Sequence, residues 1–218
     1  MARVLYIFLL LIISCSDNNP LIDSAADQIQ SESWIFVANE GNFGSNNGSI
    51  SMISELGDVI TTYDLGETVQ SLEVYNNKLI VLINGSSEMK IFNISEDGLD
   101  MPGITIDLDS SGPRELVVIE DKVYFTNWNS QDIKIFNLFN YEFEDSISMP
   151  GLPEDIILDG ETLWVAITMN FDGTSAGEVL QIDLSTQSII ATKSVGPGPQ
   201  DLEIINDEGK QTCEVVVF

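Results

Sequence analysis

Residues 112–126 read GPRELVVIEDKVYFT, and this stretch contains the pattern that decides the fold. A glycine and a proline precede the polar pair Arg114-Glu115, which is followed by the apolar run 116–119. The acidic residues 120–121 then lead into a second run that is rich in Val, Tyr and Phe. Two β-rich runs joined by a short polar turn predict a β-hairpin.

The same pattern recurs along the chain at a nearly constant period. The aligned aliphatic residues are Leu72, Leu116, Ile156 and Leu202, which are 44, 40 and 46 residues apart. A third strand is predicted over 50–53, 89–92, 133–136 and 179–182, and a fourth over 59–63, 104–108, 143–148 and 189–195. Pro113, Pro153 and Pro199 precede three of the polar pairs. Because proline cannot donate a hydrogen bond within a central strand, we expect these prolines in the loops that lead into the repeats.

Four short strands in every 40–46 residues, without a helical period, are typical of a β-propeller blade. One four-stranded sheet cannot bury both of its apolar faces, whereas radial stacking covers each face with a neighbouring sheet. We therefore predict an all-β fold, a β-propeller of four-stranded antiparallel blades over residues 34–218. A β-sandwich with coincidental spacing is the alternative.

The repeats resemble the YVTN or YncE-like propeller family. The resemblance is carried by the segments GPREL (112–116), LPEDI (152–156) and GPQDL (198–202), and by DGETLWV (159–165) and VLQIDL (179–184). The segment NEGNFG (39–44) is similar to the opening blade of Bacteroidota lipoproteins of this group. The resemblance implies the fold more strongly than an activity, since members include unassigned surface proteins and binders of small ligands such as cobalamin.

Members of that family typically have seven blades, whereas residues 34–218 supply about four and a half. The segment 211–218 also departs from the repeat. We interpret the domain as an incomplete propeller, a truncated seven-bladed ring, and a five-bladed ring with an unusual closing strand is the alternative.

The N-terminus predicts export and lipid attachment. Arg3 precedes the apolar run 4–13, which is too short for a normal transmembrane helix but suits a secretory signal. The run ends in Ile12-Ile13-Ser14-Cys15, which resembles the lipobox of bacterial lipoproteins. We predict a signal peptide over 1–14, lipidation of Cys15, and a flexible acidic tether over 15–33. An ordinary signal peptide followed by a chance cysteine is the alternative.

These features predict a cell-envelope protein that is attached to the outer membrane through its lipid alone. They leave open whether the domain lies on the periplasmic side or on the cell-surface side of the outer membrane. The chain has 8 Lys and Arg residues against 35 Asp and Glu residues, a formal net charge of −27. That charge argues against nucleic acid as a partner, because phosphate binding needs a basic surface.

The candidate binding residues lie in loops that a propeller brings to one face. They are Asn39, Asn42, Phe43, Arg114, Trp128, Asn170 and Phe171. Aromatic rings combined with amides and one arginine suit a sugar, a corrin-like ring or a peptide loop. The alternative is that the Asn residues serve turn geometry and the rings cover blade edges.

The carboxylates Glu115, Asp155 and Asp201 recur at the starts of the inner strands. They either hold Ca²⁺ or, as we favour, accept backbone N–H bonds, so no metal site and no cofactor is predicted. The chain has no His, and no carboxylates are paired at a diagnostic spacing, so no catalytic residue is predicted. The favoured function is a non-catalytic module that binds a small molecule or an envelope protein. The alternatives are a structural or assembly scaffold of the outer membrane, and a lactonase- or lyase-like propeller enzyme.

Overall fold

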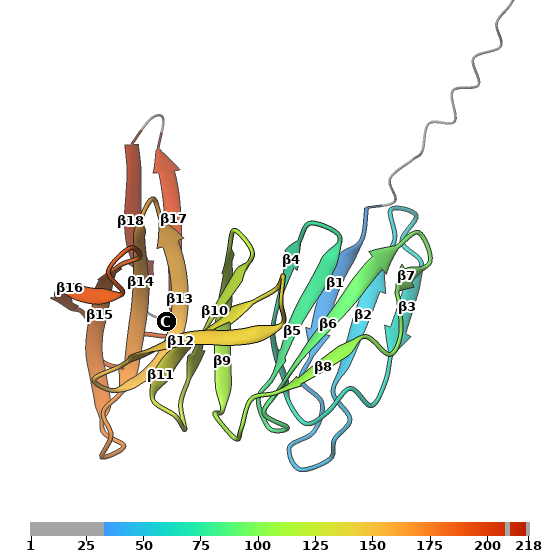
Figure 1. Cartoon of the computed structure of the whole chain (residues 1–218), viewed down its shortest axis with the longest axis horizontal. Coiled ribbons are helices and arrows are strands. Elements are labelled where there is room, and N and C mark those ends of the chain that lie inside the picture. Colours follow the sequence, from blue (N-terminus) through green and yellow to red (C-terminus); the bar gives the residue numbers. More distant parts are fainter. Residues whose placement is uncertain (1–32, 208–209, 217–218) are drawn as a thin grey trace, which may run out of the picture. The chain divides into compact units, whose positions relative to one another are not determined.

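Short segments with alternating Val, Ile and Phe form the regular structure of the chain. The structure is a computed structural model, and it describes residues 33–207 and 210–216. The predicted signal peptide, Cys15 and all of the tether except Ser33 lie outside the described residues. Every regular element of the described chain is a β-strand (Figure 1). Among these residues no helix is long and apolar enough to cross a membrane.

The strands form five antiparallel sheets in chain order. The first sheet contains β1 (Ile35–Asn39), β2 (Ser49–Ile53) and β3 (Val59–Thr62). The second contains β4 (Val69–Tyr75), β5 (Lys78–Ile83), β6 (Glu88–Ser95) and β8 (Ile104–Asp107), with the two-residue β7 (Gly98–Leu99) paired to β6. The third contains β9 (Pro113–Ile119), β10 (Lys122–Asn127), β11 (Asp132–Asn137) and β12 (Glu142–Ser148). The fourth contains β13 (Leu152–Asp159), β14 (Thr162–Met169), β15 (Ser175–Asp183) and β16 (Ser188–Ser194), and the last is the hairpin β17 (Asp201–Asp207) and β18 (Lys210–Val216).

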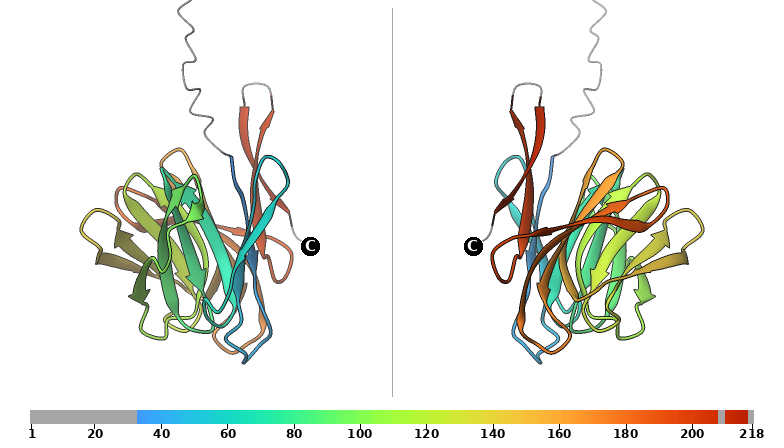
Figure 2. Two further views of the ribbon diagram at one scale, coloured as in Figure 1. Left: turned by 90° about the vertical axis from the view of Figure 1, so that its right-hand side faces the viewer. Right: turned by 90° about the vertical axis from the view of Figure 1, so that its left-hand side faces the viewer.

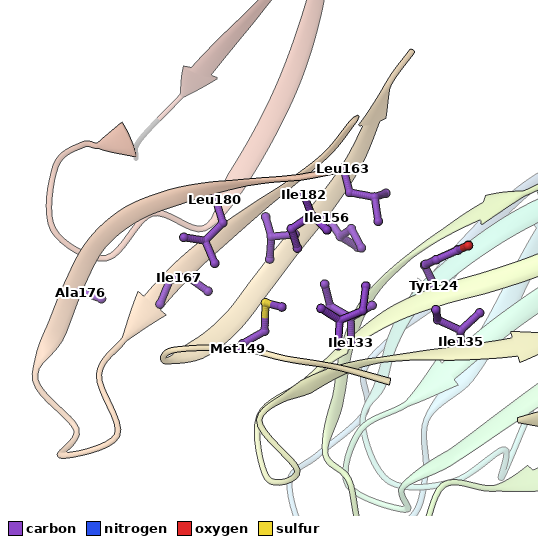
Figure 3. Packing of buried hydrophobic residues seen from close by; sticks show 12 residues of the cluster. Tyr124, Ile133, Ile135, Met149, Ile156, Leu163, Ile167, Ala176, Leu180 and Ile182 are labelled. Carbon is purple, nitrogen blue, oxygen red and sulfur yellow. The ribbon is translucent and has the colours of Figure 1, made fainter. Parts of the chain in front are cut away.

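Adjacent sheets bury apolar side chains between them. Tyr124 and Ile135 of the third sheet pack in one cluster with Leu163 and Ile182 of the fourth sheet (Figure 3). Neighbouring positions on β10 point the other way, because Phe125 packs with residues of the second sheet. Successive side chains of a strand therefore go to opposite neighbours, as the two-residue period of a strand requires. The first strands of successive sheets, β4, β9, β13 and β17, contact one another and form the inner layer. This arrangement confirms the predicted β-propeller.

The sheets of the described chain are open and do not complete a ring. The first sheet has three strands, and the last has two. In the first sheet, the edge strand β1 takes the place that β5 holds in the second sheet. Among the described residues, the first sheet therefore has no inner strand that corresponds to β4. The side chains of Ile35 and Val37 on β1 are 63% and 38% exposed. The prediction of an incomplete propeller of about four and a half blades is thereby confirmed.

The expectation that proline stays in the connecting loops is wrong for two of the three residues. Pro113 is the first residue of β9, and Pro153 is the second residue of β13. Both strands are inner edge strands that pair on one side only, where a missing N–H is tolerated. The ladder between β13 and β14 also shifts register on both sides of Pro153.

The last hairpin differs from the others in register, as the divergence of its sequence suggested. In the second, third and fourth sheets the aligned aliphatic residue pairs with a residue nine positions later, as Leu116 does with Phe125. Leu202 instead pairs with Val215, thirteen positions later, so both strands extend two residues further before the turn.

Candidate functional site

The loops between second and third strands lie at the same end of the sheets as the loops that lead into the inner strands (Figures 1 and 2). The loops between second and third strands are residues 40–48, 84–87, 128–131 and 170–174. The strand directions require this placement, because each second strand runs toward the end at which its sheet's inner strand began. Residues from different repeats can therefore meet at this end.

Arg114 stands at the centre of a polar network at this end of the sheets. Its Nε donates to both carboxylate oxygens of Glu154, at 3.0 and 3.1 Å, and its Nη2 donates to Oε1 at 2.5 Å. Its Nη1 donates to the side-chain oxygen of Gln70 at 3.0 Å. Gln70, Arg114 and Glu154 occupy the same position in three successive repeats, at the starts of β4, β9 and β13. The network therefore ties three blades together at the inner layer.

Trp128 covers the guanidinium group of Arg114. The Cζ atom of Arg114 lies 4.4 Å from the centre of the Trp128 ring, which is a cation–π distance. Trp128 belongs to the loop between β10 and β11. Two of the residues singled out in the sequence are thus brought into direct contact.

Two cavities open beside Arg114. One, which we call the seam pocket, has a volume of about 310 Å³ and lies between the second and third sheets. It is lined by residues 84–87, Ser110, Gly112, Arg114, Trp128 and Asn129. The other, of about 330 Å³, is lined by Ala38, Glu40, Val69, Gln70 and Arg114. Both volumes are at the lower end of those that hold small ligands.

The predicted residues of the first sheet do not line either of these two cavities. The amide Nδ2 of Asn39 donates to the hydroxyls of Ser49 and Ser51, at 3.2 and 2.9 Å, so it joins β1 to β2. The backbone N–H of Asn42 donates to Asn47 within its own loop at 2.7 Å. The ring of Phe43 is 94% exposed.

The predicted residues of the fourth sheet, Asn170 and Phe171, also lie outside the lining of both cavities. Asn170 donates through Nδ2 to the Thr174 hydroxyl at 3.1 Å, and its backbone bonds also close this loop. The ring of Phe171 is 55% exposed at the tip. The asparagines of these two loops therefore maintain loop conformation, which is the alternative that the sequence left open.

Sequence reasoning missed the part of the seam pocket that residues 84–87 (NGSS) provide. This loop has only four residues and contains no aromatic residue, whereas each of the other three loops contains one, so it did not stand out beside them. Its place in the repeat was the available signal, because it joins the second and third strands of its blade.

A second feature at the inner layer is a groove of about 680 Å³ that contains the recurring carboxylates. Asp155 accepts the backbone N–H groups of Ile156 and Leu202, at 2.8 and 2.5 Å, and so links β13 to β17. Burial raises the pKa of Asp155 to about 6. Burial likewise raises the pKa of Glu115 to about 7, although hydrogen bonds from Ser71 and Gln70 oppose the shift.

Among the described residues no three Asp, Glu, His or Cys side chains are grouped so that they could hold a metal ion.

Comparisons with known proteins support the fold. No family model and no curated protein matches the chain. A Bacteroides fragilis protein provisionally described as a 6-phosphogluconolactonase is similar in structure, with a TM-score of 0.60 and 16% sequence identity, over 79% of this chain and 57% of that one. The WD40 domain of Toxoplasma gondii coronin has a TM-score of 0.58 and 10% identity, over 73% and 43% of the two chains. Hydrazine synthase of Kuenenia stuttgartiensis has a TM-score of 0.56 and 15% identity, over 72% and 46%.

This chain spans about half the length of these solved structures. The sequence identities are low, so the likeness concerns the fold alone. The chain is a β-propeller of the general kind that these proteins contain.

Proposed function

We propose that this chain is a cell-envelope lipoprotein of the YVTN or YncE-like type whose propeller binds a small molecule or an envelope protein. In this proposal the domain is non-catalytic and uses no cofactor. The binding face is the end of the sheets that carries Arg114, Trp128 and the seam pocket. The lipid on Cys15 is the only attachment to the membrane.

The arrangement around Arg114 is the observation that supports binding. Three blades each contribute one polar side chain to this network, and Trp128 adds an aromatic surface. A concave site with a few convergent polar groups beside an aromatic ring is typical of ligand-binding sites. Propellers act both as binding modules and as enzymes, and nothing in the described network pairs a nucleophile with a base.

A scaffold role is the second candidate, and the loops of the first and fourth sheets favour it. Asn39 uses its amide to join β1 to β2, and Asn170 uses its amide within its own loop, so neither amide is directed at a ligand. Exposed rings such as Phe43 then serve contact with another protein rather than capture of a small ligand.

The binding proposal is tested by capturing partners with Trp128→Ala and a matched control. Phe139 lies in the turn between β11 and β12, at the opposite end of the third sheet, and is 87% exposed. We expect Trp128→Ala to weaken capture of an envelope protein or small molecule at least about tenfold, and Phe139→Ala to leave it unchanged. Equal capture by both variants would remove the Arg114 face from consideration.

Attachment is tested separately with Cys15→Ser. Radiolabelled palmitate should enter the membrane fraction with the unmodified chain and should not label the variant. Labelling of Cys15→Ser, or release of the unmodified chain into the soluble fraction, contradicts the lipoprotein proposal. This experiment does not depend on any ligand.

A further inference from the structure

The seam pocket has a lining that is polar but carries no carboxylate and no aliphatic side chain. Its hydroxyls come from Ser86, Ser87 and Ser110, and its side-chain amides come from Asn84 and Asn129. Trp128 is its one large ring. This lining is unusual in a chain with a net charge of −27. An apolar ligand would find only one large apolar surface in this pocket, the ring of Trp128. The pocket therefore favours a ligand with many polar groups.

The charge in the seam pocket is balanced before any ligand enters. Arg114 is the only charged residue in the lining, and it forms an ion pair with Glu154. Both side chains of this pair are largely buried, with exposed fractions of 21% and 10%. An anionic ligand would therefore have to compete with Glu154 for the guanidinium group, in the field of an acidic protein.

Most of the backbone N–H groups around the seam pocket already donate hydrogen bonds within the protein. Gly112 donates to the Ser87 hydroxyl at 3.1 Å, Gly85 donates to the Glu67 carbonyl at 2.9 Å, and Ser87 donates to the Asn84 carbonyl at 3.0 Å. Phosphate sites in proteins commonly rely on several free backbone N–H groups that converge on the anion. Phosphate binding by such a backbone nest is therefore disfavoured here.

The groups that remain are neutral donors and acceptors. Asn84 and Asn129 donate through Nδ2 to the carbonyls of Pro113 and Ser110, at 2.8 and 3.0 Å, which leaves both Oδ1 atoms as acceptors. The Ser87 hydroxyl accepts from Gly112, so its O–H remains a donor, and Ser87 is only 8% exposed. Side-chain acceptors and a hydroxyl donor beside an indole ring match a ring that has hydroxyls at its rim and C–H groups on its face.

We propose that the seam pocket binds a neutral sugar ring. This inference rests on the proposed binding function and specifies the ligand class for it. The sugar stacks on Trp128, and its hydroxyls pair with Asn84, Asn129 and Ser87. The volume of about 310 Å³ is suited to a ligand of ring size.

The test measures binding of simple sugars to the purified chain by saturation-transfer NMR and calorimetry. The neutral probes are glucose, galactose, mannose and N-acetylglucosamine, and glucuronate and glucose 6-phosphate are the charged comparators. We expect at least one neutral sugar to bind with a dissociation constant below about 10 mM and more tightly than both charged sugars. Absence of binding by all neutral sugars, or tighter binding of a charged one, overturns the proposal.

Two variants and one control assign the binding to the seam pocket. Trp128→Leu should weaken the sugar complex at least about tenfold, and Asn129→Leu should weaken it about fivefold. Asn129 is exposed, so its replacement leaves folding intact, and a thermal melt of each variant verifies this. Phe139→Ala, at the opposite end of the sheet, should bind like the unmodified chain. Sugar binding that survives Trp128→Leu overturns the assignment to this pocket.

The outcomes separate this inference from the function on which it rests. If a protein partner or a charged compound binds in a Trp128-dependent way and no neutral sugar binds, the binding face stands and the sugar inference fails. If no ligand of any class depends on Trp128, both fail.

Discussion

Arg114 shows how a single side chain joins separate repeats at the residue scale. Its guanidinium group bonds to residues 44 positions earlier and 40 positions later, and it stacks on Trp128. Similar links cross the seams elsewhere. Glu73 accepts the backbone N–H of Val118 at 2.8 Å, and Asp155 accepts that of Leu202. Polar side chains of the inner strands thus fix the positions of neighbouring blades.

Thr126 provides another such link, and its removal gives the first prediction. Its buried hydroxyl donates to the Glu154 carbonyl at 2.6 Å and accepts the Glu115 N–H at 3.0 Å. Thr126→Val keeps the shape but leaves both partners unsatisfied, so we expect the free energy of unfolding to fall by about 1–3 kcal/mol. Urea denaturation measures this, and Thr192→Val on the exposed outer strand is the control. Equal stabilities of the two variants would contradict the role given to Thr126.

Glu115 predicts a pH dependence of stability. Its folded pKa of about 7 lies above its ordinary value of 4.5, so the folded state binds this proton more tightly than the unfolded state. The stability that this group contributes is therefore complete below about pH 4.5 and is lost as the pH rises through about 7. Asp155 acts in the same direction, with a folded pKa of about 6.

We expect Glu115→Gln to lose less unfolding free energy than the unmodified chain between pH 4.5 and 8, by on the order of 1–3 kcal/mol. Urea titrations at several pH values measure the difference. Parallel pH profiles for the two proteins would show that Glu115 titrates normally. Glu161→Gln, on the exposed turn between β13 and β14, serves as the control for loss of one charge.

At the scale of the elements, each strand is stabilised by the sheets on either side of it. β10 places Tyr124 toward the fourth sheet and Phe125 toward the second. The sequence predicted these strands to within a few residues, because alternation and the turn between paired runs are local properties. It misplaced Pro113 and Pro153, because whether a strand lies at an edge is decided by pairing between distant segments.

Phe125 gives the prediction at this scale. It is fully buried in the cluster between the second and third sheets. Phe125→Ala leaves a cavity at that seam and should lower the free energy of unfolding by about 3–5 kcal/mol. Phe139→Ala removes the same atoms from an exposed turn and should change it by less than about 0.5 kcal/mol. Denaturation curves for the two variants measure the contrast, and a loss below about 1 kcal/mol at Phe125 would mean that this seam is loosely packed.

At the scale of the whole domain, the described sheets are open, and the first sheet has an uncovered face. Ile35 and Val37 alternate with Phe36 and Ala38, which pack against the second sheet. The exposed pair lies on an edge strand, and such edges promote association between chains. Chains of this sequence should therefore associate as their concentration rises.

The double substitution Ile35→Lys and Val37→Lys tests this expectation. We expect dynamic light scattering to show fewer large species, with little change in melting temperature, because both side chains are exposed. Leu56→Lys places a charge at a turn residue that is 91% exposed but lies outside the strand. If the control reduces association as much as the double variant, general charge rather than the edge of β1 is responsible.

The sequence by itself determined the propeller, because a blade is a local object. Its strands, turns and 40–46-residue period are all encoded by neighbouring residues. The sequence also singled out Arg114 and Trp128, which the structure joins. It did not distinguish them from Asn39, Asn42 and Asn170, which belong to equivalent segments of other repeats but bond within their own loops or to adjacent strands.

Only the tertiary structure decided which residues meet. The contact of Gln70, Arg114 and Glu154, and the seam pocket that residues 84–87 help to line, depend on the angle and spacing at which separate blades pack. The pKa shift of Glu115 depends on the same packing, since burial causes it. Blade packing is fixed by apolar clusters that draw on several strands at once, and no local sequence pattern specifies their geometry.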